Sequence, residues 1–133
     1  MSISFGEFIK EKRIRSEHSL KEVAKEIGIS AVYQSSIETG KRPAPSYEVL
    51  LKFKNALDLD GDEFGEMLDL AAKSKNARAV AFDIADYINE NEVIRHTLRF
   101  ALKNNVPESE WVDFSIQLLK NIINIDYYRI DNS

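Results

Sequence analysis

The sequence predicts an all-α protein, because helix-capping signals and helical hydrophobic spacing recur along the chain. Ser4 and Ser19 each stand three residues before a glutamate, which is the spacing of a helix-capping box. After each serine, hydrophobic residues recur at intervals of three and four. We therefore expect five helices in a domain over residues 1–73, three more over residues 77–125, and a tail over residues 126–133.

The first two helices should be bounded by these capping signals. The first should run from Ser4 to about Ser16, and its hydrophobic residues are Phe5, Phe8, Ile9 and Ile14. The second should begin after Ser19 and end at Gly28, because glycine adopts at least cost the positive φ that ends many helices.

A third short helix should follow almost at once. Ser30 can cap a helix over residues 31–39, which stops at Gly40. Two short helices joined by three or four residues make the helix-turn-helix plan. In that plan the second helix enters the major groove of DNA, and the first lies across the sugar-phosphate backbone.

Two more helices should complete the first domain. Pro43 and Pro45 make a stiff extended turn, after which Ser46 can cap a fourth helix. A fifth helix should run from Glu63 to about Lys73. The short stretch of residues 74–76 then becomes the candidate domain boundary.

The C-terminal region shows three further helical patterns. The first is the stripe Ala77, Val80, Ala81, Ile84 and Ile88. Asn91 can cap the second, and residues 104–107 separate it from a third that opens near Pro107. The third carries two adjacent apolar stripes, so its apolar face is wider than that of a helix with one side in solvent. Its first stripe is Trp111, Phe114, Leu118 and Ile122.

Composition narrows the class of protein. The chain has no cysteine, so it has neither a disulfide framework nor a thiolate metal site. No apolar run approaches the length of a membrane span, and the N-terminus lacks the regions of a signal peptide. His18 and His96 are isolated, and no nucleophile or phosphate-binding motif is present. We expect a cytoplasmic, non-enzymatic protein without metal or cofactor.

Charge is distributed unevenly over the chain. Residues 1–57 carry 10 Lys/Arg and 7 Asp/Glu, whereas residues 58–133 carry 8 and 15. The net charge is thus +3 in the first part and −7 in the second. The basic part contains the helix-turn-helix pattern, as a phosphate-binding surface requires, although +3 over this length is also within ordinary scatter.

Residues 4–70 resemble the DNA-binding domain of the lambda/Cro-type phage repressors, the Xre family of helix-turn-helix regulators. The resemblance rests on five residues at the positions of the family motif and on the segment 36–42, Ser-Ile-Glu-Thr-Gly-Lys-Arg, which is close to the family's usual ending of the recognition helix. Those five are Leu20, Ala24, Gly28, Ile29 and Ile37. The resemblance implies a five-helix, lambda-repressor-like domain that binds double-stranded DNA.

The family pattern also implies which residues contact DNA. The outward positions of the recognition helix, which would contact bases, are Ala31, Val32, Ser35 and Ser36. The positions for phosphate contacts are Ser19, Lys21, Tyr33, Lys41 and Arg42. Ala31 and Val32 can offer only apolar contact, for instance to a thymine methyl group, and the serines are permissive.

Two features concern the packing of the recognition helix. The family often pairs an arginine of its first helix with a glutamate at the end of the recognition helix, here Arg13 and Glu38. Gln34 departs from the family pattern, which places Leu, Ile or Val at this position. Either its amide bonds to neighbours such as Glu38, or the helix is rotated so that Gln34 reaches DNA.

We expect the C-terminal helices to join two copies of the chain. Family members bind two half-sites about one DNA turn apart, so two domains must be held together. Trp111, Phe114, Leu118 and Ile122 should then lie in a dimer interface, unless they close a core within one chain. The resulting hypothesis is a homodimeric repressor of a palindromic operator.

Two alternative functions remain open. The protein would be the antitoxin of a toxin–antitoxin pair if the acidic C-terminal half held a toxin. It would be a protein–protein adaptor if it kept the fold without binding DNA.

Overall fold

The structure is a computed structural model that describes residues 3–131, without the side chains of residues 126–128, 130 and 131. Every regular element in this part of the chain is an α-helix. In order, the helices of this part are α1 (Phe5–Arg15), α2 (Leu20–Ile27), α3 (Ala31–Glu38), α4 (Tyr47–Ala56), α5 (Gly61–Lys75), α6 (Phe82–Glu90), α7 (Glu92–Lys103) and α8 (Glu108–Asp131). The predicted all-α class is confirmed.

Capping boxes fix the starts of α1 and α2. Ser4 Oγ accepts a hydrogen bond from the Glu7 backbone nitrogen at 3.1 Å, and Glu7 Oε2 accepts one from the Ser4 nitrogen at 3.2 Å. Ser19 and Glu22 repeat this reciprocal pair. Both predicted capping boxes are confirmed, and each supplies partners for two backbone groups that the helix itself leaves unpaired.

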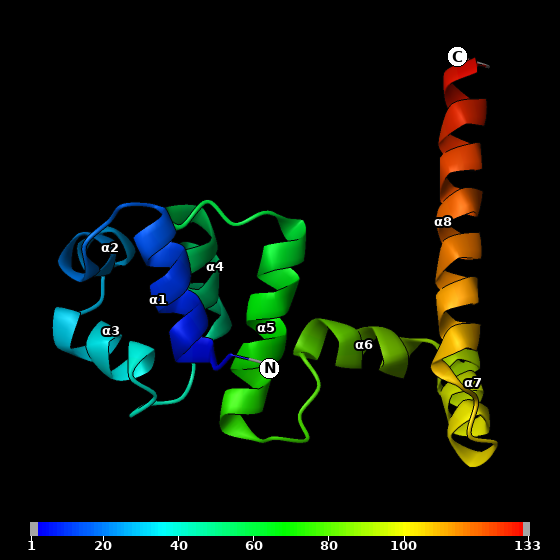
Figure 1. The fold of residues 1–133 in the computed structure, drawn as a ribbon, viewed down its shortest axis with the longest axis horizontal. Coiled ribbons are helices and arrows are strands. Elements are labelled where there is room, and N and C mark those ends of the chain that lie inside the picture. Colours follow the sequence, from blue (N-terminus) through cyan, green and yellow to red (C-terminus); the bar gives the residue numbers. More distant parts are fainter. Residues whose placement is uncertain (1–2, 132–133) are drawn as a thin grey trace. The chain divides into compact units, whose positions relative to one another are not determined.

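Helices α1–α5 enclose one hydrophobic core (Figure 1). Helix α1 packs against α3 and α5, and α2 packs against α3 and α4. The largest fully buried apolar side chains are Phe8, Phe53, Ile9, Ile37, Leu57, Met67 and Val23. This core holds α2 and α3 in place from the side opposite their solvent-facing residues.

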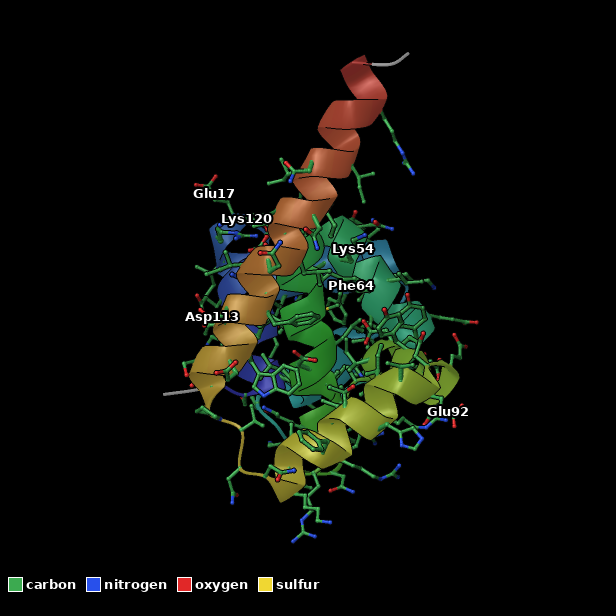
Figure 2. The ribbon with its side chains drawn as sticks, turned by 90° about the vertical axis from the view of Figure 1, so that its right-hand side faces the viewer. Glu17, Lys54, Phe64, Glu92, Asp113 and Lys120 are labelled. Atoms are coloured by element: carbon green, nitrogen blue, oxygen red, sulfur yellow. The ribbon has the colours of Figure 1, made fainter. Side chains whose placement is uncertain are left out.

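Charged side chains add contacts around this core. Glu63 accepts a hydrogen bond from Arg15 and forms a salt bridge of 3.1 Å with Lys12, and both contacts join α5 to α1. The hydrogen bond from Arg15, with those from the Asp60 backbone and Lys12, lowers the pKa of Glu63 to about 2. On α4, Lys54 Nζ lies 5.0 Å from the centroid of the Phe64 ring of α5 (Figure 2).

Helix α5 begins two residues before the predicted Glu63. Asp60 is the N-cap, because its Oδ1 accepts a hydrogen bond of 2.8 Å from the Glu63 nitrogen. The helix then continues to Lys75, beyond the expected end of the first domain at residue 73. At the preceding helix, Ser46 occupies the N-cap of α4 but makes no side-chain capping hydrogen bond.

The expected helical stripe from Ala77 to Ile88 is wrong in its first half. Residues 76–81 are not helical, and α6 begins only at Phe82. Asn76 Oδ1 accepts a hydrogen bond of 3.0 Å from the Arg78 nitrogen, and the Asn76 carbonyl accepts one from Ala79. These bonds form a turn that competes with the helix.

The compact units divide after Tyr87 rather than at residues 74–76. Ala81 is buried in the core of the first unit, and the Phe82 ring meets the Tyr47 ring edge-on at 4.7 Å. The segment after α5 therefore belongs to the first unit because its side chains pack there.

The second unit contains α7 and α8. Helix α8 continues to Asp131, through most of the expected tail at residues 126–133, and residues 132–133 lie outside the described part. With 24 residues against 12 in α7, α8 is about 36 Å long against about 18 Å. Helix α7 is therefore too short to cover α8.

Candidate nucleic-acid interface

The turn between α2 and α3 consists of Gly28, Ile29 and Ser30. Gly28 has φ 80° and its nitrogen donates to the Ala24 carbonyl, which ends α2 in a left-handed residue. Ser30 Oγ accepts a hydrogen bond of 3.0 Å from the Tyr33 nitrogen, which starts α3. Hydrogen bonds within these three residues thus fix where α2 ends and where α3 begins.

Helix α3 presents one face to solvent. The predicted base-contact residues lie together there and line a depression of about 360 Å³ with Thr39 and Lys41. Val32 in the first turn has the most prominent side chain, with 80% of its surface exposed. We call Ala31, Val32, Ser35, Ser36 and Thr39 the recognition surface.

Thr39 was missed because the family pattern assigned base contacts only to the first turns of the helix. It is the C-cap of α3, one residue after the last helical position. Its Oγ1 donates a hydrogen bond of 2.9 Å to the Ser35 carbonyl, which draws the side chain along the recognition surface. The general tendency of Thr to bond to the preceding turn is the signal that could have found it.

The opposite face of α3 is buried and polar at two positions. Gln34 is fully buried, and its Nε2 donates a hydrogen bond of 3.0 Å to Glu38 Oε2. The Gln34 side chain therefore lies on the face of α3 that is turned toward the core and does not face outward. Arg13 of α1 donates from Nε and Nη2 to the two Glu38 oxygens, each at 3.0 Å.

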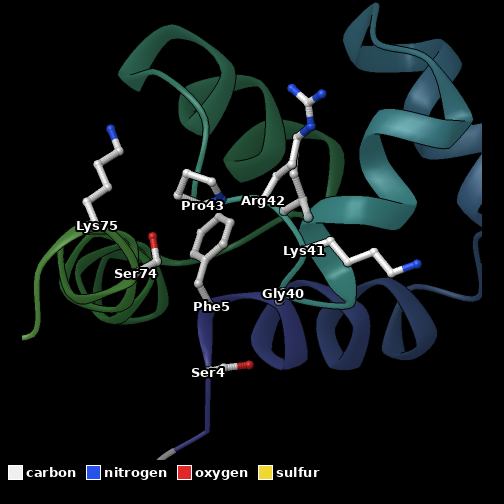
Figure 3. A pocket seen from close by; sticks show the side chains of 10 residues that line it. Ser4, Phe5, Gly40, Lys41, Arg42, Pro43, Ser74 and Lys75 are labelled. Atoms are coloured by element: carbon white, nitrogen blue, oxygen red, sulfur yellow. The ribbon is translucent and has the colours of Figure 1, made fainter.

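The loop after α3 carries Lys41 and Arg42, both exposed. Their side chains leave the loop in different directions (Figure 3). The loop borders a cavity of about 530 Å³, which is also lined by the start of α1 and the end of α5. The Arg42 guanidinium lies 5.8 Å from the centroid of the Tyr33 ring. Tyr33 itself packs partly against the core, so it gives Arg42 a fixed support.

The remaining predicted phosphate contacts lie at the start of α2. Ser19 and Lys21 are both exposed. Hydrogen bonds from the backbone nitrogen and the side chain of Ser19 lower the pKa of Glu22, so this end of α2 carries a carboxylate. Ser19 is thus engaged in capping, and Lys21 is the cation of this turn.

The predicted interface residues of α8 are exposed in the single chain. Trp111, Phe114, Leu118 and Ile122 keep between 36% and 58% of their surface accessible. Trp111 and Phe114 contact each other edge-on, with ring centroids 6.5 Å apart. These four residues, which we call the α8 stripe, do not close a core within the described part of the chain.

The fold and the arrangement of α2 and α3 define a helix-turn-helix domain. Comparison with known proteins agrees, since residues 4–67 match the family model described as a helix-turn-helix domain. A solved structure, a complex of the SinR and SinI proteins, is 24% identical in sequence, covering 88% of this chain and 97% of that chain with a TM-score of 0.46. No curated protein matches the sequence.

The described residues contain no group of three or more His, Cys, Asp or Glu side chains able to hold a metal ion. Within the same residues, no helix combines the length and apolar character needed to cross a membrane.

Proposed function

We propose that the chain is a DNA-binding transcriptional regulator of the lambda/Cro (Xre) type. The observation that carries this proposal is the division of α3 into two faces. Gln34, Ile37 and Glu38 are buried against the domain, whereas Val32 and Ser35 are exposed. A short helix supported in this way can enter the major groove without rearranging the core.

The cations of the domain support the same function. Lys41 lines the depression next to the recognition surface, and Arg42 follows it on the same loop. Phosphate contacts on either side of a recognition helix position it over the base edges. We infer that Lys41, Arg42, Lys21 and Tyr33 bind phosphates, while Ala31, Val32, Ser35 and Ser36 face the bases. Ser19 bonds to Glu22 in the capping box, so its part is to fix the start of α2 beside Lys21.

We infer further that the regulator is a homodimer that represses by occluding a promoter at a palindromic operator. Support comes from the second unit, where none of the described side chains of α7 and α8 is buried. Phe100 and Ala101 of α7 line an apolar groove of about 210 Å³ with Trp111 and Phe114 of α8. A second copy with the same exposed surfaces would cover them, since a two-fold interface is self-complementary.

Titration of the chain against a labelled DNA duplex, taken from the region upstream of its own gene, tests DNA binding. We expect saturable binding at low salt, and strong weakening by Ser35→Asp, because its carboxylate would face the phosphates. Ser109→Asp, at an exposed position in the first turn of α8 before the α8 stripe begins, is the matched control and should bind as the unchanged chain does.

Two outcomes of this titration would contradict the proposal. Absence of duplex binding at low salt would favour a protein–protein adaptor. Equal weakening by both Ser→Asp changes would show that α3 does not contact the DNA.

A separate observation tests the antitoxin alternative. Co-purification of the chain with the product of a toxic neighbouring gene would favour it.

A further inference from the structure

The recognition surface lacks charged side chains. Glu38 is the charged residue within α3, and it is buried against Arg13. The first turn exposes the methyl group of Ala31 and the isopropyl group of Val32. Lys41, which lines the same depression, follows the other end of the helix.

The hydroxyl groups toward the end of the helix already donate their protons. Ser36 Oγ donates to the Tyr33 carbonyl at 2.7 Å, and Thr39 Oγ1 donates to the Ser35 carbonyl at 2.9 Å. Toward a ligand, both oxygens therefore present lone pairs. Bidentate recognition of guanine needs two donors aimed at O6 and N7, which this surface does not supply.

Within the major groove, one base carries an exposed apolar group. Thymine presents its 5-methyl group there, whereas the other bases present polar edges. An isopropyl group placed on a polar edge removes water from donors or acceptors without replacing their hydrogen bonds, which is unfavourable. The same group placed on a methyl removes apolar surface from water, which is favourable.

We propose that Val32 recognises the 5-methyl group of thymine, so that the DNA bound by this chain is selected by methyl contact under the first turn of α3. This inference rests on the proposed DNA binding and specifies the ligand of the same surface. Ala31 borders the contact, and Ser35 contributes a permissive hydroxyl one turn further along the helix.

The test uses duplexes that the full chain enriches from a random library. In the tightest of them, each thymine is replaced singly by deoxyuridine, which lacks only the 5-methyl group. We expect at least one replacement to weaken binding about fourfold, the effect of one buried methyl-sized group. Replacement of adenine by 7-deazaadenine at the same base pair should leave affinity unchanged, because it removes an acceptor that Val32 cannot use.

Substitutions in the protein assign the effect to Val32. Val32→Ala should abolish the sensitivity to that methyl group, and it should fold, since alanine favours helix more than valine does. Val80→Ala is the matched control at an exposed valine before α6, and it should keep the full sensitivity.

The outcomes separate the two levels of the proposal. Duplex binding that no deoxyuridine weakens, or weakening that Val32→Ala retains, would overturn the inference and leave DNA binding intact. Failure to enrich or bind any duplex would overturn the proposed function and this inference together.

Discussion

Arg13 and Glu38 join the first helix to the end of the recognition helix through two parallel hydrogen bonds. Arg13 Nε and Nη2 each lie 3.0 Å from a Glu38 carboxylate oxygen. The third nitrogen, Nη1, donates to the His18 carbonyl at 3.1 Å, immediately before α2. A single guanidinium therefore touches α1, α3 and the connection that enters α2.

Replacing Arg13 by Met should lower the free energy of unfolding by about 3–5 kcal/mol, because it leaves a buried carboxylate without its cation. The Glu38 side chain is only 4% exposed, so water cannot take the place of the lost partner. Urea denaturation measures the change. Lys10→Met, at an exposed position of the same helix, should change stability by no more than about 0.5 kcal/mol. Equal effects of the two substitutions would show that the pair contributes nothing specific.

Gly6 sets how closely α1 approaches α3. A Cβ atom at this position would lie 2.4 Å from the Ile37 carbonyl oxygen and 2.5 Å from that of Glu38. Because both are backbone atoms, Gly6→Ala should force the helices apart and cost about 1–3 kcal/mol by thermal or urea unfolding.

Gly65→Ala provides the control for Gly6→Ala. Gly65 lies inside α5 with nothing within 4 Å of an added Cβ, so alanine should stabilise it slightly. A neutral result at Gly6 would contradict the close contact between α1 and α3.

Glu63 should make stability depend on pH in the acid range. Its folded pKa is about 2, below the ordinary value of 4.5, so its contribution is complete above about pH 4.5 and is lost as pH falls toward 2. Glu63→Gln should therefore lower the Tm at neutral pH, and the difference in Tm from the unchanged chain should shrink steadily as pH falls from 4.5 toward 2.

The matched control for Glu63 is Glu66→Gln, at an exposed position of α5. It should leave the Tm nearly unchanged throughout the same pH series. A Tm difference for Glu63→Gln that stays constant with pH would rule out the ionised carboxylate as its cause.

The α8 stripe should hold two chains together. Leu118→Lys with Ile122→Lys places two charges among its apolar side chains. We expect the unchanged chain to sediment as a dimer at micromolar concentration, and the doubly changed chain to sediment as a monomer. Gln117→Lys with Asn121→Lys adds the same charge to the same helix at exposed positions that bond to each other. This control should remain a dimer, and a monomeric unchanged chain would contradict the interface.

Local signals in the sequence were sufficient to predict the helix-turn-helix. Ser4, Ser19 and Gly28 act within one helical turn of their own position, so their effect can be inferred without tertiary contacts. Asp60 and Asn76 were harder to interpret, because several acids and polar residues nearby could cap or end a helix equally well. The start of α5 was misplaced by two residues for this reason.

Contacts between distant segments lay outside what the sequence could reveal. The close approach of Gly6 to the carbonyls of α3 depends on how two helices pack, and nothing near Gly6 in the sequence indicates it. The burial of Gln34 is similar, because spacing alone left both an inward and an outward orientation open. Hydrophobic spacing identified the α8 stripe, but spacing alone could not show that α7 leaves these side chains exposed.

The salt dependence of DNA binding tests the central claim most directly. Replacing Lys41 and Arg42 together by alanine should flatten the slope of log affinity against log salt by about two units, because each phosphate contact accounts for roughly one. Lys103→Ala with Lys120→Ala, two exposed cations of the second unit, should leave the slope unchanged. An unchanged slope after the loss of Lys41 and Arg42 would contradict the placement of this loop on the DNA backbone.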